Sequence, residues 1–270
     1  MRELTLEEIQ SESLQILSVI DSFCTENNIS YSLGYGALIG AVRHQGFIPW
    51  DDDIDILMTR PNYQRFIKLF SVDESIKKCG LKLFAPELGN CFFLISRICD
   101  TKRTEVKTYF QWSDEVTGLW IDLFPIDAFS ENEVGQIRLQ NERCFNICGA
   151  KVPFSTDFNL RRNLIIFYKR IKYRNYDRDA EIKRYLNLIE KLPEFDKSQK
   201  VTNFGSPYEH TDIHRKQIFE SYQRTQFSGK EVTIICSYDE YLRNIYGDYM
   251  ILPPQSKRVR GHSDNKYFWK

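Results

Sequence analysis

Four aspartates lie close together near the N-terminus: Asp51, Asp52, Asp53 and Asp55. Side chains alternate between the two faces of an extended strand, so Asp51, Asp53 and Asp55 would share one face. Like charges at this spacing repel each other, and burial would raise their pKa values unless a cation lay among them. Carboxylates bind Mg²⁺, which keeps positions free for phosphate oxygens. The cluster therefore favours a metal site for phosphoryl or nucleotidyl transfer, and the alternative is a solvated acidic loop.

The residues that follow weaken the loop alternative, because Ile54, Ile56 and Leu57 continue the run into an apolar strand. A second candidate carboxylate is Asp122, which lies in the apolar segment WIDLFPID. A carboxylate between large hydrophobic residues must find a partner, since its burial alone is costly. If the two strands are neighbours, Asp122 would complete a site of three carboxylates. We interpret Asp127 as a turn or helix-capping residue.

The elements that must position these residues can be read from hydrophobic spacing. Residues 5–28 predict an amphipathic helix, residues 61–70 a second helix, and several β-type segments lie between 80 and 127. Helical segments follow at 131–148 and over a long tract at 158–192. We expect an α+β fold, with a catalytic core at residues 1–130 and a mostly helical extension at 131–270 that completes the donor and acceptor site.

Glycines precede the aspartates in the segment Gly34-Tyr35-Gly36-Ala37, which joins a strand to a helix. Such glycines let a phosphate approach backbone N–H groups, although the spacing is not that of a dinucleotide site. Arg43 could hold a phosphate through two hydrogen bonds, or could be a solvated helix residue.

Residues 34–55 read GYGALIGAVRHQGFIPWDDDID and closely resemble the signature of the LicD family. This family includes bacterial phosphocholine transferases and is related to the fukutin-type transferases. The segments IDLFPID at 121–127 and YGDYM at 246–250 support the resemblance. One departure is Ala37, where many relatives carry Thr and where a hydroxyl contact to phosphate would be lost.

The resemblance implies a nucleotidyltransferase-like fold and a phosphotransferase. Such an enzyme would move a phospho-alcohol, most commonly phosphocholine, from a CDP-activated donor such as CDP-choline to a hydroxyl of a cell-surface glycan. The acceptor would be a precursor of teichoic acid, capsule or lipopolysaccharide. Asp53, Asp55 and Asp122 would hold Mg²⁺, or Mn²⁺, and Asp122 would accept the proton of the attacking hydroxyl. We expect substrate contacts from Gly34, Gly36, Ala37, Arg43, His44, Trp50, Asp51, Tyr246, Asp248, Tyr249, Arg258 and His262.

Two other functions share parts of this pattern. A nucleotidyltransferase that adds NMP to a small molecule or protein would use the same carboxylates, and a non-catalytic relative would only bind glycan or nucleotide. Tyr35, Trp50, Tyr246 and the aromatic C-terminal residues could form a cage for a quaternary ammonium group, although each could also simply pack in the core.

The whole chain contains 37 basic and 37 acidic residues, so its formal net charge of zero offers no overall attraction to nucleic acid. The N-terminal segment is acidic and lacks the apolar run of a secretory signal, and we expect a cytoplasmic protein. The seven cysteines form no CxxC pair and are expected to be buried thiols. We interpret His210 and His214 as the start of a surface helix.

Residues 159–174 read NLRRNLIIFYKRIKYR and combine six basic with no acidic side chains. This amphipathic segment could lie on an anionic bilayer at the inner face of the membrane, where lipid-linked glycan acceptors are made. The alternative is a helix that packs on the catalytic core with its basic side in water.

Overall fold

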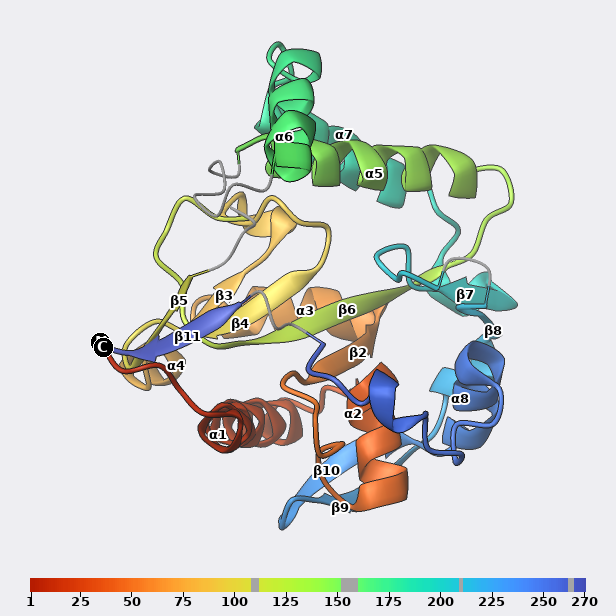
Figure 1. Ribbon diagram of the computed structural model, residues 1–270. Coiled ribbons are helices and arrows are strands. Elements are labelled where there is room, and N and C mark those ends of the chain that lie inside the picture. The colour runs from red at the N-terminus through yellow and green to blue at the C-terminus, as the bar shows by residue number, and fades with distance from the viewer. Residues whose placement is uncertain (108–111, 152–159, 209–210, 262–264) are drawn as a thin grey trace.

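The computed structural model describes residues 1–107, 112–151, 160–208, 211–261 and 265–270 (Figure 1). The helices are α1 (Leu6–Glu26), α2 (Tyr35–Ile39), α3 (Arg60–Phe70), α4 (Glu74–Lys78), α5 (Val134–Lys151), α6 (Leu160–Lys172), α7 (Arg178–Ile189) and α8 (Tyr238–Tyr246). The strands are β1 (Ser32–Leu33), β2 (Asp55–Thr59), β3 (Leu81–Phe84), β4 (Ser96–Asp100), β5 (Thr104–Lys107), β6 (Trp120–Ala128), β7 (Lys200–Thr202), β8 (Ile213–Arg215), β9 (Tyr222–Phe227), β10 (Lys230–Ile235) and β11 (Lys266–Trp269).

The main sheet is mixed, with the strand order β1-β2-β6-β4-β3. Strands β2 and β6 are parallel, whereas β1, β4 and β3 join the sheet in antiparallel fashion. The far end of β6 also pairs with β7, which in turn pairs with β8. All nine residues of β6 are buried, as expected for a central strand with both faces covered. Strand β6 is therefore the element around which the sheet is built.

Helices α1 and α3 pack on one face of this sheet. Helix α1 begins at a capping box, in which the Thr5 hydroxyl accepts a hydrogen bond from the Glu8 backbone N–H at 3.3 Å and the Glu8 carboxylate accepts one from the Thr5 N–H at 2.9 Å. Its apolar stripe, which includes Ile9, Ile16 and Ile20, is fully buried. Burial of this stripe against the sheet is what holds the helix, since caps contribute only about 1 kcal/mol.

Helices α5, α6 and α7 form a separate layer above the other face of the sheet (Figure 1). A second, smaller apolar cluster joins this layer to the core and includes Leu94, Ile137, Ile182 and Tyr185. The chain then returns to the N-terminal half, because β11 pairs with β5 and β10 packs beside β1. Residues beyond 130 thus complete the structure that begins before it, and the division at residue 130 stays a prediction.

The predicted α+β class, with a mixed sheet and flanking helices, is confirmed. Several local expectations were wrong. The tract 158–192 holds two helices, α6 and α7, because the chain turns at Asn175 and Asp177 caps α7 through its carboxylate. His214 lies fully buried in β8 rather than on a surface helix, and His210 lies outside the described residues. All seven cysteines are free thiols, but Cys79 and Cys236 are exposed.

Asp127 is neither a turn residue nor a cap, because it lies buried near the end of β6. Its two carboxylate oxygens accept hydrogen bonds from Nε and Nη2 of Arg60 at 2.6 and 2.7 Å. The side chains of Arg60 and Asp127 are only 12% and 2% exposed. Arg60 also contacts Glu87 at 3.2 Å. The first residue of α3 is thereby tied to the central strand.

Asp127→Asn should lower the free energy of unfolding by about 3 kcal/mol, because it leaves the Arg60 charge buried with its closest partner removed. Urea unfolding followed by circular dichroism measures this loss. The matched control is Glu115→Gln, which breaks the exposed Lys82–Glu115 pair and should cost less than about 1 kcal/mol. Equal losses in the two variants would contradict the structural role of Asp127.

Candidate active site

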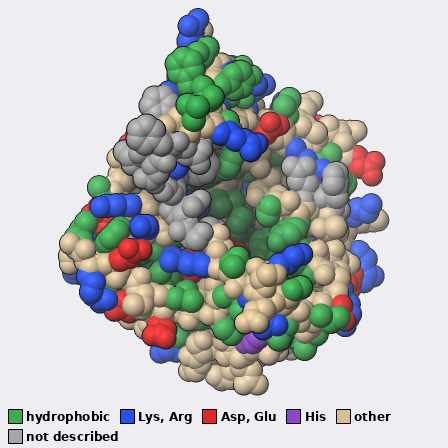
Figure 2. Space-filling view, viewed as in Figure 1, with side chains coloured by type: hydrophobic (Ala, Val, Ile, Leu, Met, Phe, Trp, Pro, Cys, Tyr) green, Lys and Arg blue, Asp and Glu red, His purple; other side chains and the backbone are tan. Residues whose placement is uncertain are grey.

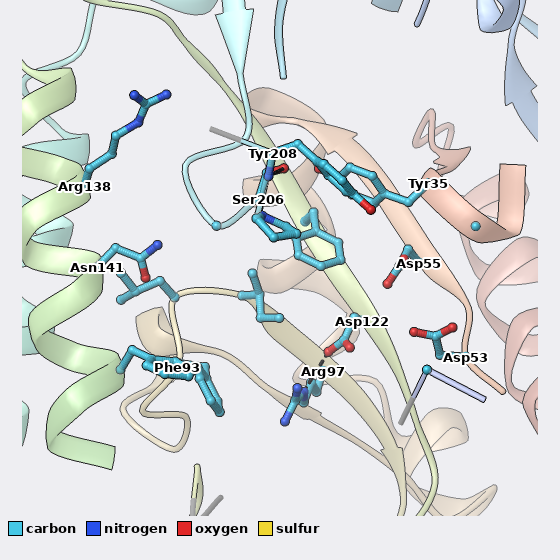
Figure 3. A pocket seen from close by; sticks show the side chains of 18 of the residues that line it. Tyr35, Asp53, Asp55, Phe93, Arg97, Asp122, Arg138, Asn141, Ser206 and Tyr208 are labelled. Atoms are coloured by element: carbon cyan, nitrogen blue, oxygen red, sulfur yellow. Dashed lines mark hydrogen bonds and ion pairs between the residues drawn. The ribbon is translucent and has the colours of Figure 1, made fainter. Parts of the chain in front are cut away.

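A cavity of about 760 Å³ opens between the main sheet and helix α5 (Figure 3). Its floor is formed by side chains from β2, β4 and β6, and α5 forms the opposite wall. The segment 205–208 closes one side. The residues that line the cavity include Tyr35, Gly36, Asp51, Asp53, Asp55, Phe93, Arg97, Asp122, Phe124, Arg138, Asn141, Glu142, Phe145, Ser206, Tyr208 and Tyr246.

Two of the predicted catalytic aspartates lie side by side on the sheet. Asp55 begins β2 and is the direct partner of Asp122 in the parallel register of β2 with β6. The backbone N–H of Asp122 donates to the carbonyl of Ile54 at 3.2 Å. Both carboxylates line the cavity, so the predicted adjacency of the two strands is confirmed.

The segment before β2 is irregular, so the expected strand over Asp51 and Asp53 does not form. The predicted alternation still holds, because Asp51 and Asp53 line the cavity while Asp52 is buried against Arg260 in an ion pair. The carboxylates of Asp51, Asp52 and Asp53 can bring oxygen atoms within 4.8 Å of one another, a spacing that could hold a metal ion. This group differs from the predicted set of Asp53, Asp55 and Asp122, which stays a prediction.

The environment of Asp55 disfavours its charged form. Burial is the main cause that raises the pKa of this carboxyl well above its usual range, and the negative charges of Asp53, Asp122 and Asp51 raise it further. Arg97 acts in the opposite direction with a smaller effect. A site that concentrates carboxylates in this way has the chemistry of a divalent-cation site.

Arg97 lies directly opposite Asp122, on the antiparallel neighbour strand β4. Its Nε donates to Asp122 Oδ1 at 2.7 Å, and the indole N–H of Trp120 donates to Asp122 Oδ2 at 3.2 Å. Aromatic rings surround the guanidinium group, whose carbon lies 4.4 Å from the ring centre of Trp120 and 4.6 Å from that of Trp112. Arg97 therefore supplies a positive charge next to these carboxylates, in addition to any metal ion that they would hold.

The side of the cavity next to Asp55 is aromatic (Figure 3). Tyr35 stacks on Tyr208, with ring centres 5.9 Å apart, and meets Phe124 edge to face at 5.5 Å. Tyr208 in turn contacts Tyr246 at 5.2 Å. Of the residues predicted to form an aromatic cage, Tyr35 and Tyr246 line the cavity. Tyr267, Phe268 and Trp269 instead belong to β11, which pairs with β5.

Tyr35 is held by a buried polar network behind the cavity. Its hydroxyl donates to the Asp212 carboxylate and accepts from the Asn203 amide at 2.7 Å. His214 Nε2 lies 2.8 Å from the other oxygen of Asp212. The Tyr35 backbone has a φ of 44°, a left-handed conformation that costs free energy in a non-glycine residue. The network therefore fixes one orientation of the ring.

The predicted glycine segment has a packing role in the structure. Gly34 caps α2 through its backbone, and a Cβ atom there would lie 2.7 Å from Leu57 Cγ. Gly36 lines the cavity, and a Cβ atom there would lie 2.7 Å from a carboxylate oxygen of Asp51. Ala37 is buried. Gly36 thus leaves the room that Asp51 occupies.

Four residues that were predicted to contact substrate do not line the cavity. Arg43 donates to the carbonyl of Tyr249 and to the His44 ring, and the guanidinium of Arg258 lies 5.5 Å from the ring centre of Trp50. Burial is the main cause that lowers the pKa values of Arg43 and His44, and neighbouring arginines add to it. The structure therefore does not bring Arg43, His44, Trp50 and Arg258 to the cavity wall.

The remaining predicted contacts come from the C-terminal segment. Tyr246 lines the cavity, whereas the Tyr249 hydroxyl donates to Asp239 at 2.9 Å. Asp248 is exposed in the turn after α8. His262 lies outside the described residues.

Sequence reasoning missed several lining residues. Arg97 carried a usable signal, because an arginine within the apolar strand ISRICD requires a buried carboxylate partner. Arg138, Asn141 and Glu142 lie on a helix of mixed polarity, and Tyr208 lies in a loop, so nothing in their local pattern separates them from ordinary surface residues. The fold alone brings them to the cavity.

Comparisons with known proteins find relatives of this sequence. Residues 28–148 match the family described as "LicD/FKTN/FKRP, nucleotidyltransferase domain". This range contains the glycine segment, the aspartate cluster and Asp122. The chain is also similar to the lipopolysaccharide cholinephosphotransferase LicD of Haemophilus influenzae, with 28% identity over 99% of both chains. Residues 28–148 thus match the nucleotidyltransferase domain of the LicD family. The family predicted from residues 34–55 is thus confirmed.

Two rickettsial proteins share shorter regions with this chain. An uncharacterized protein of Rickettsia typhi is 28% identical over 55% of this chain and 44% of its own length. An uncharacterized protein of Rickettsia prowazekii is 52% identical over 42 residues, which cover 16% of each chain.

Asp55→Asn should stabilise the metal-free protein at pH 7.5, with a rise in Tm of about 2–4 °C for each 1 kcal/mol gained. The native fold favours protonated Asp55, so its contribution to stability is lost as the pH rises from the ordinary aspartate range through the raised pKa. The amide avoids this loss, and the difference should shrink toward pH 4.5. Thermal unfolding in the presence of a chelator measures both values.

The matched control for this measurement is Asp248→Asn, which changes an exposed aspartate and should leave Tm unchanged at either pH. A lower Tm for Asp55→Asn at pH 7.5 would show that the Asp55 carboxylate is not under electrostatic strain.

Proposed function

We propose that this chain is a phosphotransferase of the LicD type that transfers phosphocholine from CDP-choline to a hydroxyl group of a cell-surface glycan. The observation that carries the proposal is the pairing of Asp55 with Asp122 in a cavity that an aromatic wall completes. Similarity over 99% of both chains to a lipopolysaccharide cholinephosphotransferase supports the choice of donor and acceptor class. A lipopolysaccharide precursor is the favoured acceptor, with teichoic acid and capsule precursors as alternatives.

The carboxylates that line the cavity fit an Mg²⁺ or Mn²⁺ ion. Asp53 and Asp55 would hold the ion together with Asp122, and Asp51 lies beside them. The oxygen-only donor set and the raised pKa of Asp55 agree with a hard divalent cation. When bound, such an ion offsets the negative charge of the donor diphosphate and of the departing CMP.

Asp122 and Arg97 act as a fixed pair in this proposal. Both oxygens of Asp122 accept a hydrogen bond, from Arg97 and from Trp120, which leaves fewer lone pairs for a proton. We therefore assign Asp122 to binding and positioning rather than to the predicted uptake of the hydroxyl proton. Arg97 also lines the cavity, where its remaining N–H groups could donate to a phosphate oxygen.

The aromatic wall provides a surface for the choline group. The rings of Tyr35, Tyr208 and Tyr246 lie within 6 Å of one another in succession, next to the carboxylates. Ring faces attract a quaternary ammonium group by about 1–2 kcal/mol in a desolvated site. The hydrogen bonds that the Tyr35 hydroxyl donates to Asp212 and accepts from Asn203 hold the ring in place, so the surface is formed before the donor binds.

Among the described residues, no helix is both long and apolar enough to cross a bilayer. We propose that the enzyme works in the cytoplasm at the inner face of the membrane, where a lipid-linked acceptor would be reached. The basic segment 159–174 would provide the contact.

Asp55→Asn and Asp53→Asn should each reduce transfer from CDP-choline by at least about 10³-fold, because both remove a carboxylate that we assign to the metal site. Mass spectrometry of the acceptor measures the added group. A product that carries NMP in place of phosphocholine would identify a nucleotidyltransferase instead. Binding of glycan or nucleotide without any product would identify a non-catalytic relative. Full activity in either variant would exclude the assignment of the carboxylates.

Tyr208→Leu should raise the KM for CDP-choline by about 5–30-fold with little effect on kcat, because the lost ring–cation attraction is worth about 1–2 kcal/mol. Tyr208→Phe is the matched control, since it keeps the ring and should retain the KM. Steady-state kinetics with CDP-choline and CDP-glycerol measure the effect. An equal rise for both donors would show that the ring does not recognise choline.

A further inference from the structure

Helix α6 exposes its apolar residues. Leu160, Leu164, Phe167 and Ile171 are 71%, 58%, 55% and 52% exposed, and Ile166 is buried. A helix that only packs on a protein core would bury such side chains. Packing on the protein therefore accounts for the side of this helix that carries Ile166, and it leaves the other apolar residues in contact with solvent.

The exposed residues form one continuous stripe. Their spacing of four, three and four residues places Leu160, Leu164, Phe167 and Ile171 on the same side of a helix with 3.6 residues per turn. Ile166 lies on the other side, where α6 packs against α5. Figure 2 shows apolar and basic side chains gathered together at the end of the molecule where α6 lies in Figure 1. We call this stripe the outer face of α6.

Basic residues border the outer face. The segment 160–174 contains six basic and no acidic residues. Arg161 and Lys172 flank the stripe on one side and Arg174 follows the last turn, and all three are exposed. Lys169 is turned inward, with its Nζ 5.7 Å from the ring centre of Phe145 on α5. The surface is therefore apolar at its centre and positive at its edges.

We propose that the outer face of α6 docks on an anionic lipid bilayer, with the helix lying in the plane of the interface. Apolar side chains would enter the boundary between headgroups and acyl chains, and the flanking arginine and lysine residues would meet lipid phosphates. A second copy of this chain is a poorer occupant, because two such faces would bring like charges together. The basic residues at the edges of the outer face favour an anionic partner. The stripe itself consists of apolar side chains, which can enter the apolar part of a lipid bilayer.

This docking would place the cavity next to the membrane. Helix α5 separates α6 from the cavity and contributes Arg138, Asn141, Glu142 and Phe145 to its wall. An acceptor anchored in the bilayer would then meet the enzyme close to the cavity. This last step rests on the proposed function, whereas the docking itself does not.

Flotation of the full chain with vesicles tests the proposal. Vesicles of phosphatidylcholine containing about 30% phosphatidylglycerol should bind the wild type at least about tenfold better than vesicles of phosphatidylcholine alone. Leu164→Gln combined with Phe167→Gln should reduce binding to the anionic vesicles about tenfold or more, as should Arg161→Glu combined with Lys172→Glu. Val72→Gln combined with Val259→Gln is the matched control, since both valines are 66% exposed but lie outside α6, and it should bind like the wild type.

Circular dichroism and Tm confirm that each variant is folded. Binding of the two α6 variants at the wild-type level would overturn the proposal, as would a wild type that does not float with anionic vesicles. A wild type that forms dimers, with dimerisation lost in Leu164→Gln/Phe167→Gln and no vesicle binding, would identify a second copy as the occupant and likewise overturn it. Transfer of phosphocholine to a water-soluble acceptor tests the proposed function separately, and the α6 variants should retain that activity.

Discussion

The parallel pairing of β2 with β6 is the constraint on which the site depends. It brings two aspartates from distant parts of the sequence, Asp55 and Asp122, into direct register on one face of a buried strand pair. Carboxylates so placed repel each other, and burial adds to the cost. The protein offsets part of this cost with Arg97, which the antiparallel strand β4 places opposite Asp122. The negative charge at Asp55 that Arg97 does not offset makes the cavity suitable for a cation.

The fold provides rigid support for this charged centre. Trp112, Trp120 and Phe93 surround the Arg97 guanidinium, so its position is set by packing as well as by its ion pair. On the aromatic side of the cavity, Asp212 and Asn203 fix the hydroxyl of Tyr35. Polar networks that are fully bonded in this way stiffen a site at the positions where a substrate must be oriented. The aromatic wall and the carboxylates are therefore presented to the cavity in one arrangement.

The layer formed by α5, α6 and α7 has two distinct surfaces. Its inner side joins the small apolar cluster around Ile137 and Tyr185 and closes the cavity. The outer face of α6 instead leaves large apolar side chains in contact with solvent. Exposed apolar surface of this kind, bordered by basic residues, is typical of contact with another phase or partner. The same helical layer thus links the cavity to a surface that suits a membrane.

The sequence was informative wherever local pattern and chemistry agree. The signature residues in segment 34–55 identified the family, and hydrophobic spacing predicted α1 and α3. The apolar residues around Asp55 and Asp122 predicted that both aspartates lie on strands. It failed where a residue's partner is distant in the chain. Asp127 resembled a turn residue because its partner, Arg60, lies 67 positions away in the sequence.

The sequence by itself determined which residue types are present for chemistry, their local spacing and the family that they resemble. Only the tertiary structure decided that Arg97 neutralises Asp122, that Tyr208 and α5 line the cavity, and that α6 turns its apolar stripe outward. The physical reason is that helix and strand periodicity depends on neighbouring residues, whereas strand pairing and helix packing join residues that the sequence separates by tens to hundreds of positions.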